Sequence, residues 1–196
     1  MSRYAIIPAR SDSNRLSGKN IRTFLGRPII AYSIETALAS GLFSKVYVSA
    51  HDDQTRAIAE QYGAGVLDHP QRDGDYDIGT TEVMREHANL PLFENVSFLC
   101  CIYPCAPLMM VEDLHVGLNV LKAYGADYAF SVGTEPLCDA GAWYWGTKEA
   151  FAAGRPVFGP DSLMIPIPQS RVCDVNTERD WLRAELLYAA MHKEVA

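Results

Sequence analysis

The sequence lacks a long apolar run, an excess of positive charge and cysteines at metal-binding spacing. No stretch reaches the roughly 18–20 apolar residues of a membrane-spanning helix, and a strand is expected close to the start, which argues against a signal peptide. The net charge of −7 disfavours binding to nucleic acid or to an anionic membrane. The five cysteines have no CxxC spacing, which indicates buried free thiols in a reducing compartment and not a zinc site. We therefore expect a cytoplasmic protein whose partners are neither nucleic acids nor membranes.

Apolar runs and helical spacing alternate along the chain, as in a domain with a sheet between helices. The second helix is expected to be capped by Asp52 or Asp53, and Thr177 with Asp180 forms a capping box at the last helix. Strands are expected at 4–7, 45–50, 65–67, 96–103, 127–132, 142–145 and 172–175, and helices at 29–41, 53–63, 80–89, 111–124 and after 177. Cys100 and Cys101 share one strand and should point to its opposite faces. The sequence thus predicts one α/β domain over residues 1–196, with three layers and a mostly parallel sheet.

The loop from Ile7 to Asn20 indicates a binding site, because an apolar strand is followed directly by a segment rich in serine, glycine and cations. Arg10, Arg15 and Lys19 can neutralise phosphate oxygens, and the loop's amides and hydroxyls can wrap them. In open α/β sheets, ligands bind beyond the carboxyl ends of the strands, where this loop lies. A solvated loop after an edge strand is the alternative. Three cations in an acidic protein favour an anionic ligand.

The phosphate-binding patterns GxGxxG and GxxxxGK[ST] are absent from this loop, but another pattern is present. After IPAR, a serine-rich stretch and Lys19-Asn20, the chain carries in order GRPIIAYSI, GTT, YPCAPL, DAGAWYW and RVCDVNT. This order resembles the cytidylyltransferases that activate nonulosonic acids, the CMP-sialic acid synthetase family. The aromatic DAG segment is most similar to the pseudaminic acid branch.

The resemblance implies a Rossmann-like nucleotidyltransferase fold and a metal-assisted transfer of CMP from CTP to an acidic nine-carbon sugar, with release of pyrophosphate. Positioning and charge stabilisation supply most of the catalysis of such a transfer. The resemblance assigns catalysis to Arg10, Lys19 and Asp174, and Mg²⁺ binding to Asp174 and Asn176. Nucleotide contacts are expected from Ser11, Ser13, Arg15, Asn20, His69, Thr80 and Thr81. Substrate contacts are expected from Tyr103, Cys105, Asp139 and Trp143.

Several of these residues also have a purely structural interpretation. Thr80 and Thr81 stand where a helix begins and can serve as its cap. The segment from Tyr103 to Pro107 can be a proline-stiffened turn, and Asp174 can be a turn or cap residue.

The sequence departs from the family's pattern at several of the implied positions. Asp12 and Asn14 stand where the family has Gly and Lys, His69 stands where it tends to have Arg, and Asn176 replaces the second Asp of a D-x-D pair. The family's dimerisation arm is reduced here to a loop-sized connection at about 133–138, so any homodimer is expected to form without a swapped arm.

Two functions follow from this mixture of matches and departures. The first is a working cytidylyltransferase with a divergent site. The second is a catalytically weak or inactive relative that binds a nucleotide or sugar nucleotide in a surface-glycan pathway. A transferase for a smaller acidic sugar such as Kdo is a third interpretation. The presence of Arg10, Lys19, Asn20 and Asp174 favours the enzyme.

Overall fold

A computed structural model describes residues 2–10, 16–72 and 78–193. Its strands are β1 (Ser2–Pro8), β2 (Thr23–Phe24), β3 (Arg27–Pro28), β4 (Lys45–Ala50), β5 (Gly65–Asp68), β6 (Val96–Ile102), β7 (Tyr128–Thr134), β8 (Leu137–Thr147) and β9 (Ser162–Pro166). Its α-helices are α1 (Ile29–Ala39), α2 (Asp53–Gln61), α3 (Thr80–Ala88), α4 (Val111–Tyr124), α5 (Lys148–Ala152) and α6 (Glu178–Lys193). Short 3-10 turns are η1 (Lys19–Ile21), η2 (Pro91–Phe93) and η3 (Gln169–Arg171). In the described part of the chain, no helix is long and apolar enough to cross a membrane.

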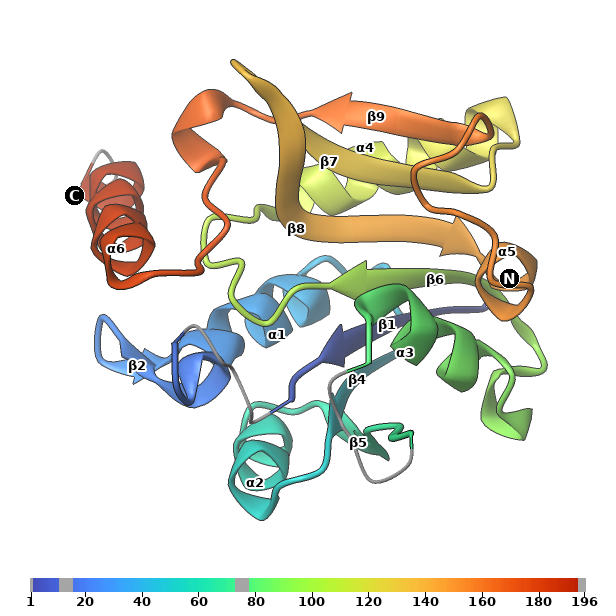
Figure 1. The fold of residues 1–196 in the computed structure, drawn as a ribbon, viewed down its shortest axis with the longest axis horizontal. Coiled ribbons are helices and arrows are strands. Elements are labelled where there is room, and N and C mark those ends of the chain that lie inside the picture. Colours follow the sequence, from blue (N-terminus) through green and yellow to red (C-terminus); the bar gives the residue numbers. More distant parts are fainter. Residues whose placement is uncertain (1, 11–15, 73–77, 194–196) are drawn as a thin grey trace.

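Seven strands form one sheet in the order β5-β4-β1-β6-β8-β7-β9, and β2 and β3 form a separate small hairpin (Figure 1). The strands β5, β4, β1 and β6 are parallel neighbours, and β9 is parallel to β7. β8 runs antiparallel to both β6 and β7. The predicted mostly parallel α/β sheet is therefore confirmed. Its parallel half brings the carboxyl ends of β1 and β6 to one edge.

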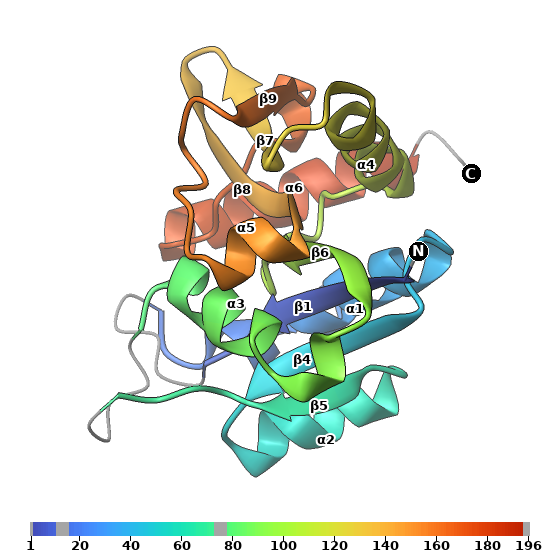
Figure 2. The ribbon, with the colours of Figure 1, turned by 90° about the vertical axis from the view of Figure 1, so that its right-hand side faces the viewer.

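Helices cover both faces of the sheet, which gives the predicted three layers (Figure 2). On one face, α1, α2 and α4 contribute apolar residues to a core that also contains Cys100. On the other face, α3 and α5 pack over a second core that contains Cys101. The two cysteines thus point to opposite faces, as the strand periodicity predicts. All five cysteines are free thiols, as expected from their spacing.

The last helix, α6, packs against α1 and the β2–β3 hairpin instead of joining the two layers. Its Trp181 lies in a third core with Phe24 and Tyr32. The predicted capping box is present, because the Asp180 carboxylate accepts the Thr177 amide at 2.8 Å and the Thr177 hydroxyl accepts the Asp180 amide at 3.2 Å. Asp52, and not Asp53, caps α2 by accepting the Thr55 amide at 2.8 Å.

The strand expected at 172–175 is absent, and β9 supplies the parallel partner of β7. Val172 and Val175 are buried, which produces the apolar pattern of a strand, but neither belongs to a strand: Val172 packs against Ala140 of β8, and Val175 lies in the third core. The signal for β9 is weak because it is an edge strand that ends in Pro166, a position where a missing N–H is tolerated. Residues 172–176 therefore form an irregular segment that runs from η3 toward η1, where Val175 contacts Lys19.

Candidate active site

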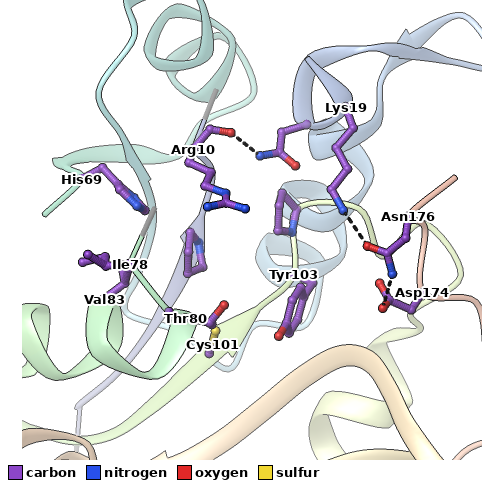
Figure 3. A pocket seen from close by; sticks show the side chains of 14 residues that line it. Arg10, Lys19, His69, Ile78, Thr80, Val83, Cys101, Tyr103, Asp174 and Asn176 are labelled. Carbon is purple, nitrogen blue, oxygen red and sulfur yellow. Dashed lines mark hydrogen bonds between the residues drawn. The ribbon is translucent and has the colours of Figure 1, made fainter. Parts of the chain in front are cut away.

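A cavity of about 470 Å³ opens at the carboxyl ends of β1 and β6, between α3, η1 and the segment before α6 (Figure 3). Eight of the predicted site residues line it: Arg10, Lys19, Asn20, His69, Thr80, Tyr103, Asp174 and Asn176. The other lining residues are Pro8, Ile78, Gly79, Val83, Cys101 and Pro104. Residues from both ends of the chain and from its middle therefore share one hollow.

Two cations and a buried amide define one side of this cavity. The Arg10 side chain points into the hollow in Figure 3. Its carbonyl oxygen accepts the Asn20 side-chain amide at 2.7 Å, and the Asn20 oxygen accepts the Cys105 thiol at 3.3 Å. Burial raises the pKa of the Cys105 thiol to about 12, so the thiol stays protonated and acts as a donor. The Asn20 side chain thus fixes the position of the Arg10 backbone.

Lys19 joins η1 to the segment before α6. Its ammonium group donates to the Val175 carbonyl at 2.8 Å and lies 3.5 Å from the Asn176 side-chain oxygen. The Asn176 amide nitrogen in turn donates to the Asp174 carboxylate at 2.6 Å. A cation, an amide and a carboxylate therefore form a row along this edge of the cavity (Figure 3).

Among the lining residues that the structure describes, the carboxylate that could bind a metal ion is that of Asp174. Mg²⁺ is commonly held by one or two carboxylates together with substrate phosphates, so Asp174 fits such an ion. The Asn176 oxygen is directed to Lys19 and its nitrogen to Asp174, so Asn176 does not add a second ligand in this arrangement. Within the described residues, no group of three or more His, Cys, Asp or Glu side chains is placed to hold a metal.

Two contacts fix the path of the segment that carries Asp174. The Arg171 guanidinium forms a two-bond ion pair with Asp113 at the start of α4, and both side chains are about nine-tenths buried. Gly141 of β8 lies directly under Asp174, since a Cβ at Gly141 would stand 3.2 Å from the Asp174 Cβ and Cγ. The sheet therefore sets how far the Asp174 carboxylate reaches into the cavity.

His69 lies on the opposite side of the cavity, near the apolar side chains of Ile78 and Val83 (Figure 3). The His69 ring is buried, and its Nδ1 lies 3.0 Å from the Ser49 hydroxyl and 3.2 Å from the Ser49 carbonyl oxygen. In Figure 3, Lys19 and Asp174 lie at one end of the hollow, His69, Ile78 and Val83 lie at the other, and the Arg10 side chain lies between them.

Tyr103 links the cavity to the DAG segment. Its hydroxyl lies 3.3 Å from that of Tyr144, which donates to the Asp139 carboxylate. Burial raises the pKa of Tyr103 to about 12, so it is a neutral hydrogen-bonding group at physiological pH. Asp139, which was predicted to contact substrate, does not line this cavity but a separate hollow, and the two hydroxyls connect it to Tyr103.

Some predicted site residues lie elsewhere. Trp143 is fully buried against Gly117 of α4, which corrects the expectation that it contacts substrate. Thr81 is exposed and lines a separate hollow, because one step along a helix turns the side chain away from that of Thr80. The N-cap of α3 is Gly79, so neither threonine serves as its cap. Cys105 lies behind Asn20 and does not line the cavity. Ser11, Ser13 and Arg15 fall outside the described residues.

Sequence neighbourhood and helical spacing would have identified most of the lining residues that were not predicted. Pro104 follows Tyr103 directly, Pro8 lies two positions before Arg10, and Gly79 directly precedes Thr80. Val83 lies three positions after Thr80 and therefore on the same face of α3.

A cation-lined hollow at the carboxyl ends of parallel strands is the ligand site of an α/β nucleotide-binding enzyme. The Cytidylyltransferase family model matches residues 4–139 of this sequence. The chain belongs to the cytidylyltransferase family and is a nucleotidyltransferase.

Curated relatives agree with this family. The chain is 31% identical to a pseudaminic acid cytidylyltransferase of Campylobacter jejuni, over 98% of this chain and 99% of that protein. It is 47% identical over 146 residues to the CMP-N,N'-diacetyllegionaminic acid synthase of Legionella pneumophila, over 71% of this chain and 60% of that one.

Solved structures agree on the fold. A CMP:2-keto-3-deoxy-manno-octonic acid synthetase complexed with CTP superposes with a TM-score of 0.74 at 15% identity, over 100% of both chains. A Mycobacterium tuberculosis protein in complex with manganese superposes with a TM-score of 0.66 at 11% identity, over 95% of this chain and 99% of that one. The predicted Rossmann-like nucleotidyltransferase fold is confirmed.

Proposed function

We propose that this enzyme transfers CMP from CTP to the anomeric hydroxyl of an acidic nine-carbon sugar of the pseudaminic or sialic type, and releases pyrophosphate. The observation that carries the proposal is the meeting of Arg10, Lys19 and Asp174 in one cavity. The named relatives support the choice of sugar class. The five free thiols suit the cytoplasm, where such a reaction would take place.

The chain's own groups have separable tasks in this reaction. Arg10 and Lys19 bind the triphosphate and offset the charge that develops on the transferring phosphoryl group and on the leaving pyrophosphate. Asn20 holds the backbone of Arg10, and the contact from Lys19 to Val175 keeps the acidic segment beside the phosphates. Tyr103, backed by Tyr144 and Asp139, presents a neutral hydroxyl toward the acceptor sugar.

Asp174 would hold a divalent cation, which we propose to be Mg²⁺, together with phosphate oxygens of CTP. When bound, the ion would neutralise those oxygens and polarise the phosphorus under attack. The Asp174 carboxylate is exposed at the cavity's edge, so it can exchange its hydrogen bond from Asn176 for such an ion.

One observation favours a second candidate, a weak or inactive relative that binds the nucleotide without efficient turnover. The resemblance implies a second carboxylate at position 176, but Asn176 stands there, and its amide nitrogen donates a hydrogen bond to one oxygen of Asp174. This candidate predicts CTP binding without the transfer step. As a further part of the proposal, the short connection between β7 and β8 leaves no swapped arm, so any homodimer would form through another surface.

The test is pyrophosphate release from CTP and Mg²⁺ with a panel of pseudaminic, legionaminic, N-acetylneuraminic and Kdo acids. Turnover with a nine-carbon acid supports the enzyme, and preference for Kdo would change the sugar class. CTP binding without turnover on any acid would support the second candidate. Arg10→Ala should abolish detectable CTP binding, whereas Lys122→Ala removes an exposed cation of α4 and should leave it unchanged. Unchanged CTP binding in Arg10→Ala would remove Arg10 from the site.

A further inference from the structure

Asp139 of β8 accepts two hydrogen bonds that lead in different directions. One carboxylate oxygen accepts the backbone amide of Gly141 at 2.9 Å. The other accepts the hydroxyl of Tyr144, which lies 3.3 Å from the Tyr103 hydroxyl. Tyr103 lines the cavity, whereas Asp139 lines a separate hollow. The Asp139 carboxylate can therefore act on the cavity only through other residues.

The segment that Asp139 holds is an irregular part of the sheet. The β7 partners of Asp139 and Tyr144 are two positions apart, but these two residues are five positions apart on β8. Such a bulge bends a strand and redirects its side chains. Within it, Gly141 has a φ of +61°, in the left-handed region that favours glycine. The bond from the Gly141 amide to Asp139 fixes this turn of the backbone.

The bulge contacts the site in two places. A Cβ at Gly141 would stand 3.2 Å from the Cβ and Cγ of Asp174, so the glycine lies against the residue proposed to hold the metal ion. The next carbonyl oxygen along β8, that of Ala142, accepts the Tyr103 amide at 2.9 Å. One short stretch of β8 thus supports both the proposed metal ligand and the tyrosine that faces the acceptor sugar.

We propose that Asp139 is a positioning residue that aligns the metal-binding end of the cavity with its acceptor end. Through the Gly141 amide it holds the backbone under Asp174. Through the Tyr144 hydroxyl it orients the hydroxyl of Tyr103. The inference rests on the proposed function, because it takes Mg²⁺ and the acceptor sugar of that reaction as the ligands.

Three substitutions separate the two bonds of Asp139. Asp139→Ala removes both. Asp139→Asn keeps an oxygen for the Gly141 amide but replaces the other acceptor by an amide nitrogen, which can only donate. Tyr144→Phe removes the hydroxyl and leaves the bond to Gly141 in place. The metal end should therefore respond to Asp139→Ala alone, and the acceptor end to all three variants.

The metal end is measured by calorimetric titration of Mg²⁺ in the presence of a non-hydrolysable CTP analogue. Asp139→Ala should weaken Mg²⁺ binding roughly 3- to 10-fold, the effect of one hydrogen bond. Asp139→Asn and Tyr144→Phe should bind Mg²⁺ as the wild-type chain does. Unchanged Mg²⁺ affinity in Asp139→Ala would overturn the link to Asp174. An equal loss in all three variants would also overturn it, because it would show general damage to β8.

The acceptor end is measured as kcat/KM for the acid that gives the highest turnover in the panel. Asp139→Asn and Tyr144→Phe should each lower this value roughly 3- to 10-fold and leave the dissociation constant of CTP unchanged. Unchanged kcat/KM for the acid in both variants would overturn the link to Tyr103. A parallel loss of CTP affinity would overturn it as well, since the effect would then not be confined to the acceptor.

Two changes on the same sheet are matched controls. Tyr128→Phe removes a hydroxyl of the second core that donates to the Arg155 carbonyl at 3.1 Å. Asp127→Ala removes a carboxylate that forms an ion pair with Arg155. Both lie at the start of β7, whereas Asp139 pairs with a residue near its end. Neither control should change the Mg²⁺ affinity or kcat/KM for the acid.

The Mg²⁺ titrations need no turnover, so they separate this inference from the proposed function. If no acid were a substrate, the proposed reaction and the link to Tyr103 would both fail, while the Mg²⁺ titrations would still decide the link to Asp174. Absence of Mg²⁺ binding by the wild-type chain in the presence of the analogue would overturn that link.

Discussion

Replacing Asn176 by Asp tests directly how the acidic edge of the cavity works. The change removes the 2.6 Å hydrogen bond from the Asn176 amide to Asp174 and sets two carboxylates side by side. Lys19, 3.5 Å from the Asn176 oxygen, would gain an ion pair that offsets part of the repulsion. Without a divalent ion we expect a loss of about 1–2 kcal/mol in the free energy of unfolding, from the lost hydrogen bond and the like-charge contact.

A bound divalent cation should turn the repulsion between the two carboxylates of Asn176→Asp into a favourable interaction. Two unit charges at about 4 Å interact by roughly 1 kcal/mol in water, so an added carboxylate gains roughly 2 kcal/mol with a doubly charged ion at this exposed edge. Asn176→Asp should therefore bind Mg²⁺ together with CTP roughly 30-fold more tightly than the wild-type chain.

Two measurements check this prediction. Urea unfolding with EDTA and with Mg²⁺ gives the two stabilities, and calorimetric titration of Mg²⁺ in the presence of a non-hydrolysable CTP analogue gives the affinity. Asn119→Asp, an exposed change of the same charge on α4, is the control and should affect neither. Equal or weaker Mg²⁺ affinity in Asn176→Asp would show that the ion does not bind at Asp174.

Further predictions concern the residues that hold the site in position and a buried histidine of α3. Gly141→Ala should lower turnover by displacing Asp174, whereas Gly125→Ala, at a similar φ of +62° but with nothing within 4 Å, should cost only the backbone strain of roughly 1–2 kcal/mol in unfolding assays. Arg171→Met leaves a buried carboxylate of α4 unpaired and should reduce the free energy of unfolding by about 3 kcal/mol and weaken CTP binding; full stability would contradict the role of this ion pair. The pKa of His87 is about 4 in the fold against an ordinary value of 6.5, so the unfolded chain binds more protons between these values. Stability should therefore fall by up to about 3 kcal/mol as the pH drops from 6.5 to 4, and His87→Gln should flatten this slope in urea titrations at several pH values.

The central strands were predictable from the sequence because each is a buried apolar run that ends in a polar loop. β4 and α4 begin and end at the predicted residues. The segment 172–175 misled the prediction because apolar alternation reports which side chains are buried, and not whether a neighbouring strand is present to pair with. Pairing depends on contacts with residues far along the chain, which a local pattern does not contain.

The site residues differ in the same way: some could be predicted from a local pattern, and others depend on contacts between distant residues. Arg10 and Lys19 could be placed because they follow a strand whose carboxyl end faces the ligand edge. Trp143 could not, because alternation along β8 sends it and Trp145 to one face and Tyr144 to the other, without indicating which face meets the cavity. The contacts of buried Ser49 with His69 and His87 were likewise not visible in the sequence, since the two histidines lie 20 and 38 positions away.

The bond from Lys19 to Val175 joins residues 156 positions apart. During synthesis on a ribosome, Arg10 and Lys19 emerge well before residues 174–176, so the cavity is without its acidic edge until those residues have been made. The packing of α6 against α1 and the β2–β3 hairpin contributes to offsetting the entropy of closing this loop. A nascent chain should therefore acquire nucleotide affinity late and abruptly, which protects CTP from being trapped by incomplete copies of the enzyme.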